Sequence, residues 1–119
     1  IVTFGYKRGI PKDCDIVFDV RFLENPHYIK ELKDLTGKDP QVQEFVFCDG
    51  RAEEYCRRML ELLLFVLKDY HKEVKQLLTV GIGCTGGKHR SVALAEKLKQ
   101  MLGENGYNVE IFHRNLLME

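Results

Sequence analysis

Apolar and polar residues along this chain form two kinds of pattern: short apolar runs and longer segments with helical spacing. Apolar runs of strand length occupy residues 1–5, 16–20 and 77–82. The run at 16–20 is almost continuous, which predicts a strand buried on both faces of a sheet. Val109 and Ile111 alternate with polar residues near the end of the chain and predict one more strand.

Helical spacing of apolar residues fills the segments between these runs. It predicts short helices over residues 28–35 and 40–47, the second capped by Asp39, and a last helix over residues 89–102. The longest helix is expected over residues 51–75. Extra apolar positions predict that this helix is covered on more than one side, and they are Leu62, Leu64 and Phe65.

The order strand, strand, helices, strand, helix, strand is typical of an α/β fold. We predict one domain over residues 1–119, built as a small, mostly parallel sheet sandwiched by helices. If the strands at 16–20 and 77–82 run parallel, their carboxyl ends bring Asp19 and Arg21 to the same rim as Cys84. Ligands of open α/β sheets bind at that rim.

A glycine-rich turn joins the strand at 77–82 to the last helix. Residues 81–91 contain four glycines and the cationic or donor side chains of Lys88, His89 and Arg90. Backbone N–H groups in such a turn, at the N-terminus of a helix, form a ready site for an anion. The segment therefore predicts a phosphate-binding strand–loop–helix unit.

Spacing tests which known phosphate loop this turn resembles. The Walker pattern G-x4-G-K-[ST] fails, because His89 follows Lys88 and Ile82 stands where the first glycine is needed. This argues against hydrolysis of nucleoside triphosphates at the loop. The G-x-G-x-x-G dinucleotide fingerprint fits, although it is a weak signal alone, through Gly81, Gly83 and Gly86.

Cys84, Arg90 and Ser91 have the C-x5-R-[ST] spacing of cysteine-dependent phosphatases. In that chemistry a thiolate at a helix N-terminus attacks phosphorus while the arginine holds phosphoryl oxygens. Asp19 is the candidate acid that would protonate the leaving group. The alternative is a neutral Cys84 that only lines the loop, with Asp19 paired to Arg21 at the strand end.

Composition narrows the function by exclusion. Lys+Arg and Asp+Glu both total 18, and this zero net charge argues against a domain that mainly binds the nucleic-acid backbone. No apolar run reaches membrane-spanning length and no signal-like start is present, so we expect a cytoplasmic protein without membrane contact. The cysteines match no zinc spacing and are expected as free thiols, namely Cys14, Cys48, Cys56 and Cys84.

Four segments together resemble the C-terminal domain of the RapZ/YvcJ family of bacterial RNase adapter and nucleotide-binding proteins. They are residues 5–11, 19–27, 35–37 and 83–92, and they occur in the family's order. The resemblance implies that this chain is the ligand-sensing C-terminal domain of a longer protein. An absent N-terminal Walker domain would bind and hydrolyse ATP or GTP, whereas this domain would hold no cofactor and catalyse no reaction.

The resemblance also implies a ligand and partners. The domain would sense glucosamine-6-phosphate, signal to its own nucleotide-binding domain, and self-associate as a homo-oligomer. Family members also bind an RNase and small RNAs, and an RNA or protein adapter surface is a further alternative here. RNA-binding members can end in a basic tail, whereas residues 115–119 are mostly apolar, which argues against RNA binding.

Carried over by position, the family's sugar-phosphate pocket would combine His27 with the glycine loop. Backbone N–H groups of residues 85–87 and the guanidinium of Arg90 would take the phosphate. His27 and Asp19 would address the hydroxyl or amino groups of the sugar. The complete candidate set is Asp19, Arg21, Asn25, His27, Cys84, Thr85, Gly86, Gly87, Lys88, His89, Arg90 and Ser91.

Overall fold

The computed structural model describes residues 1–70 and 77–116. Within these ranges the strands form one four-stranded, all-parallel sheet in the order β2-β3-β1-β4. The predicted α/β class and parallel sheet are confirmed. The strands are β1 (Val2–Gly5), β2 (Ile16–Asp19), β3 (Val80–Cys84) and β4 (Phe112–His113).

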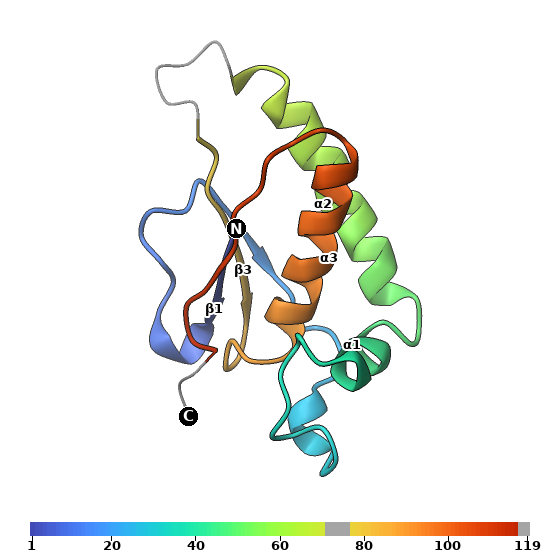
Figure 1. Cartoon of the computed structure of the whole chain (residues 1–119). Helices are drawn as coiled ribbons and strands as arrows, with labels where there is room; N and C mark the ends of the chain where they lie inside the picture. The colour runs from blue at the N-terminus through green and yellow to red at the C-terminus, as the bar shows by residue number, and fades with distance from the viewer. Residues whose placement is uncertain (71–76, 117–119) are drawn as a thin grey trace.

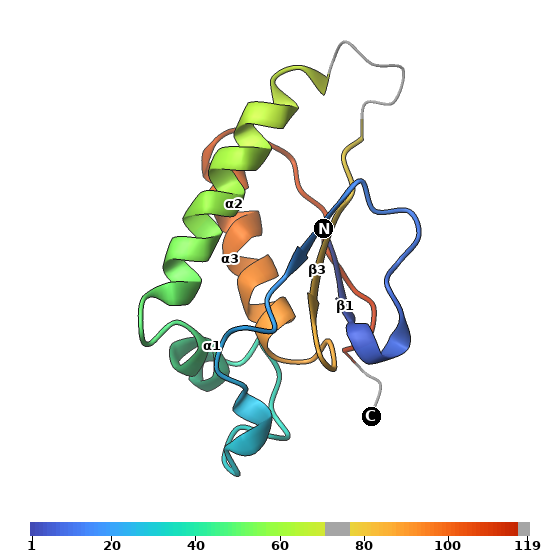
Figure 2. The same ribbon diagram turned by 180° about the vertical axis from the view of Figure 1, so that it is seen from behind.

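Helices form a second layer against this sheet. Helix α3 packs on β3 and β1, and α2 packs on α3. Figures 1 and 2 show α2 and α3 on the same side of the sheet. The two long helices therefore form one layer against one face of the sheet. The helical segments are α1 (Pro40–Val46), α2 (Arg51–Leu67), α3 (Arg90–Glu104) and the 3-10 turns η1 (Tyr6–Arg8) and η2 (Pro26–Tyr28).

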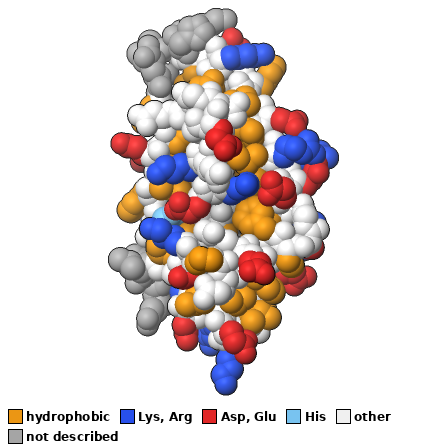
Figure 3. Space-filling model, turned by 45° about the vertical axis from the view of Figure 1, so that its right-hand side comes forward, with side chains coloured by type: hydrophobic (Ala, Val, Ile, Leu, Met, Phe, Trp, Pro, Cys, Tyr) orange, Lys and Arg blue, Asp and Glu red, His pale blue; other side chains and the backbone are white. Residues whose placement is uncertain are grey.

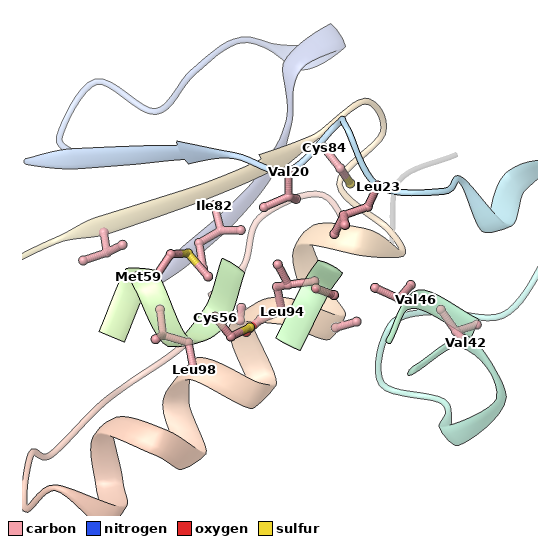
Figure 4. Close-up of a cluster of buried hydrophobic side chains, with 14 of the residues drawn as sticks. Val20, Leu23, Val42, Val46, Cys56, Met59, Ile82, Cys84, Leu94 and Leu98 are labelled. Carbon is pink, nitrogen blue, oxygen red and sulfur yellow. The ribbon is translucent and has the colours of Figure 1, made fainter. Parts of the chain in front are cut away.

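The hydrophobic core lies between the sheet and the two long helices (Figure 4). Every residue of β3 is buried, and α3 adds Leu94 and Leu98. Helix α2 contributes Cys56, Met59 and Leu63, whose spacing places them on one stripe of the helix. Burial of each large apolar side chain stabilises the fold by about 1.5–3 kcal/mol.

Two predictions about burial are wrong. Strand β2 is an edge strand whose positions alternate between half-buried and exposed, with Val17 38% exposed. The interior positions belong to β3 and β1, and β3 is the strand with every residue buried. Helix α2 is buried on one side only, because Leu62 and Phe65 are 45% and 64% exposed.

Several predicted boundaries also differ from the structure. No α-helix forms over residues 28–35, where η2 is followed by turns such as the one closed by Lys33 N–H donating to the Ile29 carbonyl at 2.9 Å. The last strand is Phe112–His113 and excludes Val109 and Ile111. Helix α2 ends at Leu67, and the predicted continuation over residues 71–75 lies outside the described residues.

Helix α1 begins where the sequence predicts, but its cap works differently. Asp39 occupies the N-cap position without a side-chain bond to the helix. Its Oδ2 accepts instead from the backbone N–H of Thr36 at 2.8 Å. The carboxylate therefore stabilises the preceding turn, which leads the chain from η2 into α1.

Candidate functional site

Strands β2 and β3 run parallel, with Asp19 in register with Gly83, so the condition for a shared rim is met. The chain after β2 and the loop after β3 therefore leave the sheet side by side. Arg90 ties them together, because its Nη1 donates to the carbonyls of Arg21 and Leu23 at 2.7 and 3.0 Å. The second Nη of Arg90 donates to Thr85 Oγ1 at 3.3 Å.

The glycine loop is packed tightly against the end of β1. A Cβ atom on Gly5 would lie 2.5 Å from the carbonyl carbon of Gly86, which is closer than real atoms approach. Gly87 has a φ of +77° and would likewise meet the backbone of Gly5. Asn115 fixes the same strand end, since its Oδ1 accepts from Gly5 N–H at 2.8 Å.

A cavity of about 500 Å³ opens beside this loop, a size that suits a small molecule. It brings together eight of the twelve predicted site residues from the loop and from the segment after β2. Gly87, Ser91, Asp19 and Arg21 are not part of its lining. The eight are Asn25, His27, Cys84, Thr85, Gly86, Lys88, His89 and Arg90.

Four further residues line the cavity that the sequence did not single out: Lys7, Tyr28, Lys33 and Asp34. Lys7 belongs to η1, and its backbone N–H donates to the Thr85 carbonyl at 3.2 Å. This bond holds η1 against the loop, so that a Cβ at Gly86 would lie 3.9 Å from Lys7 Nζ. Four cationic side chains and one carboxylate therefore line the cavity, which favours an anionic ligand.

The cavity lies at the N-terminus of α3, where the helix end carries partial positive charge. The first turn contains no acidic residue, and His89 makes no side-chain cap bond. In residues 1–70 and 77–116, no acceptor pairs with the N–H groups of Gly86 and Lys88. Gly86 N–H belongs to the predicted donor set of residues 85–87 and Lys88 N–H lies outside it, whereas Gly87 N–H donates to Cys84 Sγ at 3.3 Å.

Arg90 is 4% exposed and carries a charge that no carboxylate within ion-pair distance neutralises among the described residues. Asp19, the carboxylate on the neighbouring strand, is bonded to Arg21 instead. The Nε of Arg90 is buried without a partner in the described part of the chain. A buried cation at the positive end of a helix is costly, and an anion in the cavity would offset that cost.

Cys84 lines the cavity, but Asp19 is poorly placed to supply the proton that phosphatase chemistry needs. The Cys84 thiol is 2% exposed, belongs to the core cluster (Figure 4) and lies 3.1 Å from Ser91 Oγ. Asp19 accepts from Arg21 Nη2 at 2.6 Å, and this bond lowers the pKa of the carboxyl. Asp19 is therefore ionised near neutral pH and holds no proton for a leaving group.

His89 binds protein rather than facing open solvent. The residue is 5% exposed, and its Nε2 lies 3.1 Å from the Lys33 carbonyl oxygen. Because a carbonyl can only accept, Nε2 carries the proton. Burial lowers the pKa of His89, and the backbone bond to Lys33 opposes that effect only in part. The imidazole is therefore neutral at pH 7.

Acidification is expected to destabilise the protein through His89. Since its pKa lies below the ordinary 6.5 in the folded state, the unfolded chain takes up the proton first as pH falls, and stability decreases below pH 6.5. Urea denaturation measures the free energy of unfolding at about pH 7.5 and about pH 5.5. This free energy should fall more between the two pH values in the wild type than in His89→Gln, whose side chain cannot titrate. An equal loss in both proteins would contradict this expectation.

A second cavity, of about 630 Å³, lies at the other end of the sheet. Its lining is mainly apolar and includes Leu63, Leu102 and Ile111, but no Lys, Arg or His among the residues that the structure describes. These described residues do not offer an anion the positive charge found in the first cavity. In the described ranges no group of His, Cys, Asp or Glu side chains could hold a metal ion. Nor does any described helix combine the length and the apolar character needed to cross a membrane.

Comparison with known proteins finds a family model and several relatives that cover this chain. The family model described as the RapZ C-terminal domain matches residues 1–117. The nucleotide-binding protein of Limosilactobacillus reuteri is 52% identical over 116 residues, which cover 98% of this chain and 40% of that protein. Those of Caldicellulosiruptor bescii and Symbiobacterium thermophilum are 49% and 50% identical over 98% of this chain, and 40% and 38% of their own lengths are covered. The chain thus spans about 40% of the length of these relatives.

Proposed function

The chain belongs to the family of RapZ C-terminal domains, and from this premise we propose that it is the ligand-sensing domain of a cytoplasmic nucleotide-binding regulatory protein. Its ligand is a phosphorylated amino sugar of the glucosamine-6-phosphate type, bound in the 500 Å³ cavity. ATP or GTP binds elsewhere in the longer protein, consistent with the relatives' names and with the share of them that this chain spans.

The observation that carries the proposal is the unneutralised positive charge at the N-terminus of α3. Arg90 is buried there without a carboxylate partner in the described ranges, and Lys7 and Lys88 line the same cavity. The N–H groups of Gly86 and Lys88 add donors of the kind that hold phosphoryl oxygens. A phosphate group satisfies these donors and offsets the charge at once.

The amino group of the ligand requires a different carboxylate from the one predicted. Asp19 is bonded to Arg21 and does not line the cavity, whereas Asp34 does. We assign to Asp34 the contact with the sugar's ammonium group, and to His27 a contact with a hydroxyl. The resulting preference for the amino sugar over glucose-6-phosphate is a simple charge effect.

Calorimetry with glucosamine-6-phosphate, glucose-6-phosphate and inorganic phosphate tests this proposal directly. Lys7→Met is expected to lower the affinity for all three ligands about fivefold, because the cavity loses one exposed positive charge. Asp34→Asn should remove the preference for the amino sugar and leave inorganic phosphate unaffected. Lys12→Met is the matched control, because Lys12 lies in the same connection between β1 and β2 as Lys7 but is exposed and outside the cavity.

Two outcomes would redirect the proposal. Equal and weak binding of all three compounds, unchanged in Lys7→Met, would mean that the cavity is not the ligand site. Release of phosphate from the sugar phosphates, lost in Cys84→Ser, would establish the phosphatase alternative instead. On the face shown in Figure 3, Lys, Arg, Asp and Glu side chains are interspersed, so this face offers no basic patch to the adapter alternative.

A further inference from the structure

Residues 25–37, here called the wall, form one side of the cavity opposite the glycine loop. The wall contributes Asn25, His27, Tyr28, Lys33 and Asp34 to the lining. Its backbone forms turns rather than an α-helix after η2, and Tyr28 is 81% exposed. Its internal backbone bonds close single turns, and Pro26 and Leu32 anchor it in the core, so contacts with the loop fix how its other residues face the cavity.

The wall is joined to the loop at two points. At its end, Gly37 N–H donates to the Lys88 carbonyl at 2.9 Å, and the approach is so close that a Cβ on Gly37 would lie 2.3 Å from the His89 carbonyl oxygen. In its middle, the Lys33 carbonyl receives His89 Nε2 at 3.1 Å and Lys88 Nζ at 3.3 Å. One acceptor in the wall is therefore shared by two consecutive loop residues.

The two donors differ in what they can do when an anion enters. The ammonium of Lys88 is carried on a flexible stem, and it prefers a phosphate dianion to a neutral carbonyl because charge-assisted bonds are stronger. The His89 ring is buried and held in place. Because His89 keeps the Lys33 carbonyl paired, Lys88 can turn to the anion without releasing the wall.

We propose that His89 is a positioning residue that fastens the wall to the loop by donating its Nε2–H to the Lys33 carbonyl. Its contribution to binding is then indirect: it holds His27 and Asp34 at the cavity and leaves Lys88 free for the anion. The effect on ligand affinity rests on the proposed function, whereas the fastening of the wall does not.

Hydrogen–deuterium exchange of the ligand-free protein tests the fastening. His89→Ala should raise the exchange of amides in residues 28–37 about tenfold, while the amides of β3 keep wild-type rates. His89→Gln, whose amide nitrogen can replace Nε2 as the donor, should stay near the wild type. Ala95→Gly, a buried position of the same helix, is the control for general weakening of α3 and should not act on the wall selectively.

Wild-type exchange over residues 28–37 in His89→Ala would overturn the proposal, and so would His89→Gln behaving like His89→Ala. Calorimetry with inorganic phosphate then tests whether the fastening affects binding. The affinity for phosphate should be lower in His89→Ala and close to the wild-type value in His89→Gln. If exchange responds as expected but the wild type binds no phosphate, the fastening stands and the proposed function fails. Phosphate binding with loss in both variants would mean that His89 contacts the anion itself, and would overturn the proposal.

Discussion

Replacing Gly87 with alanine is expected to lower the free energy of unfolding by roughly 3 kcal/mol or more and to abolish binding at the loop. Gly87 has a φ of +77°, a conformation that costs an alanine strain by itself. The added Cβ would also lie 2.6 Å from the backbone nitrogen of Gly5 and 2.8 Å from the carbonyl carbon of Phe4. Backbone atoms of a central strand cannot move aside, so the loop itself must shift.

Gly86→Ala is the matched control, because it changes the neighbouring glycine of the same loop. Among the described residues, a Cβ at Gly86 would meet only the end of the Lys7 side chain, at 3.8 Å, and its φ is not positive. Denaturation in urea should show a cost below about 1 kcal/mol for Gly86→Ala. Similar losses for both variants would show that the packing of Gly87 on β1 does not determine the position of the loop.

The unit from β3 through the loop to α3 could be predicted from the sequence, because several signals agree there. The apolar run, the glycines and the spacing of Val92, Ala95 and Leu98 all indicate strand, turn and helix in that order. The burial of β2 could not be predicted in the same way. A continuous apolar run at residues 16–20 indicates a strand but does not say whether tertiary packing places it at the edge or in the centre.

Eight of the twelve residues that line the cavity could be found from the sequence, and six of these lie close together in the loop. Lys7 and Lys33 escaped notice because isolated lysines are usually solvated, and only the fold brings them to Gly86 and Lys88. The partner of His89 is a backbone carbonyl 56 positions away, which no residue type could reveal. Asp19 and Arg21 are two positions apart, and their local pairing withdraws Asp19 from the cavity.

Arg90→Ala is expected to cost about 3 kcal/mol of folding stability as well as ligand affinity. The guanidinium Nη1 donates hydrogen bonds to the carbonyls of Arg21 and Leu23. Hydrogen bonds from a charged donor contribute about 1.5–3 kcal/mol each to stability. Alanine would leave both acceptors without that donor and open a space beneath the chain after β2. Arg58→Ala is the control, since Arg58 is 72% exposed and its bond to Glu54 lies at the surface.

Arg90→Lys separates the structural role of this residue from its charge. Lysine keeps the positive charge beside the cavity but lacks the planar fork that reaches Arg21, Leu23 and Thr85 together. We therefore expect Arg90→Lys to lose most of the stability that Arg90→Ala loses, as measured by urea denaturation, yet to retain more of the affinity for inorganic phosphate. If Arg90→Lys is as stable as the wild type, the carbonyl bonds contribute little. If Arg90→Lys instead binds phosphate no better than Arg90→Ala, the geometry of the guanidinium, rather than its charge, is what an anion in this cavity requires.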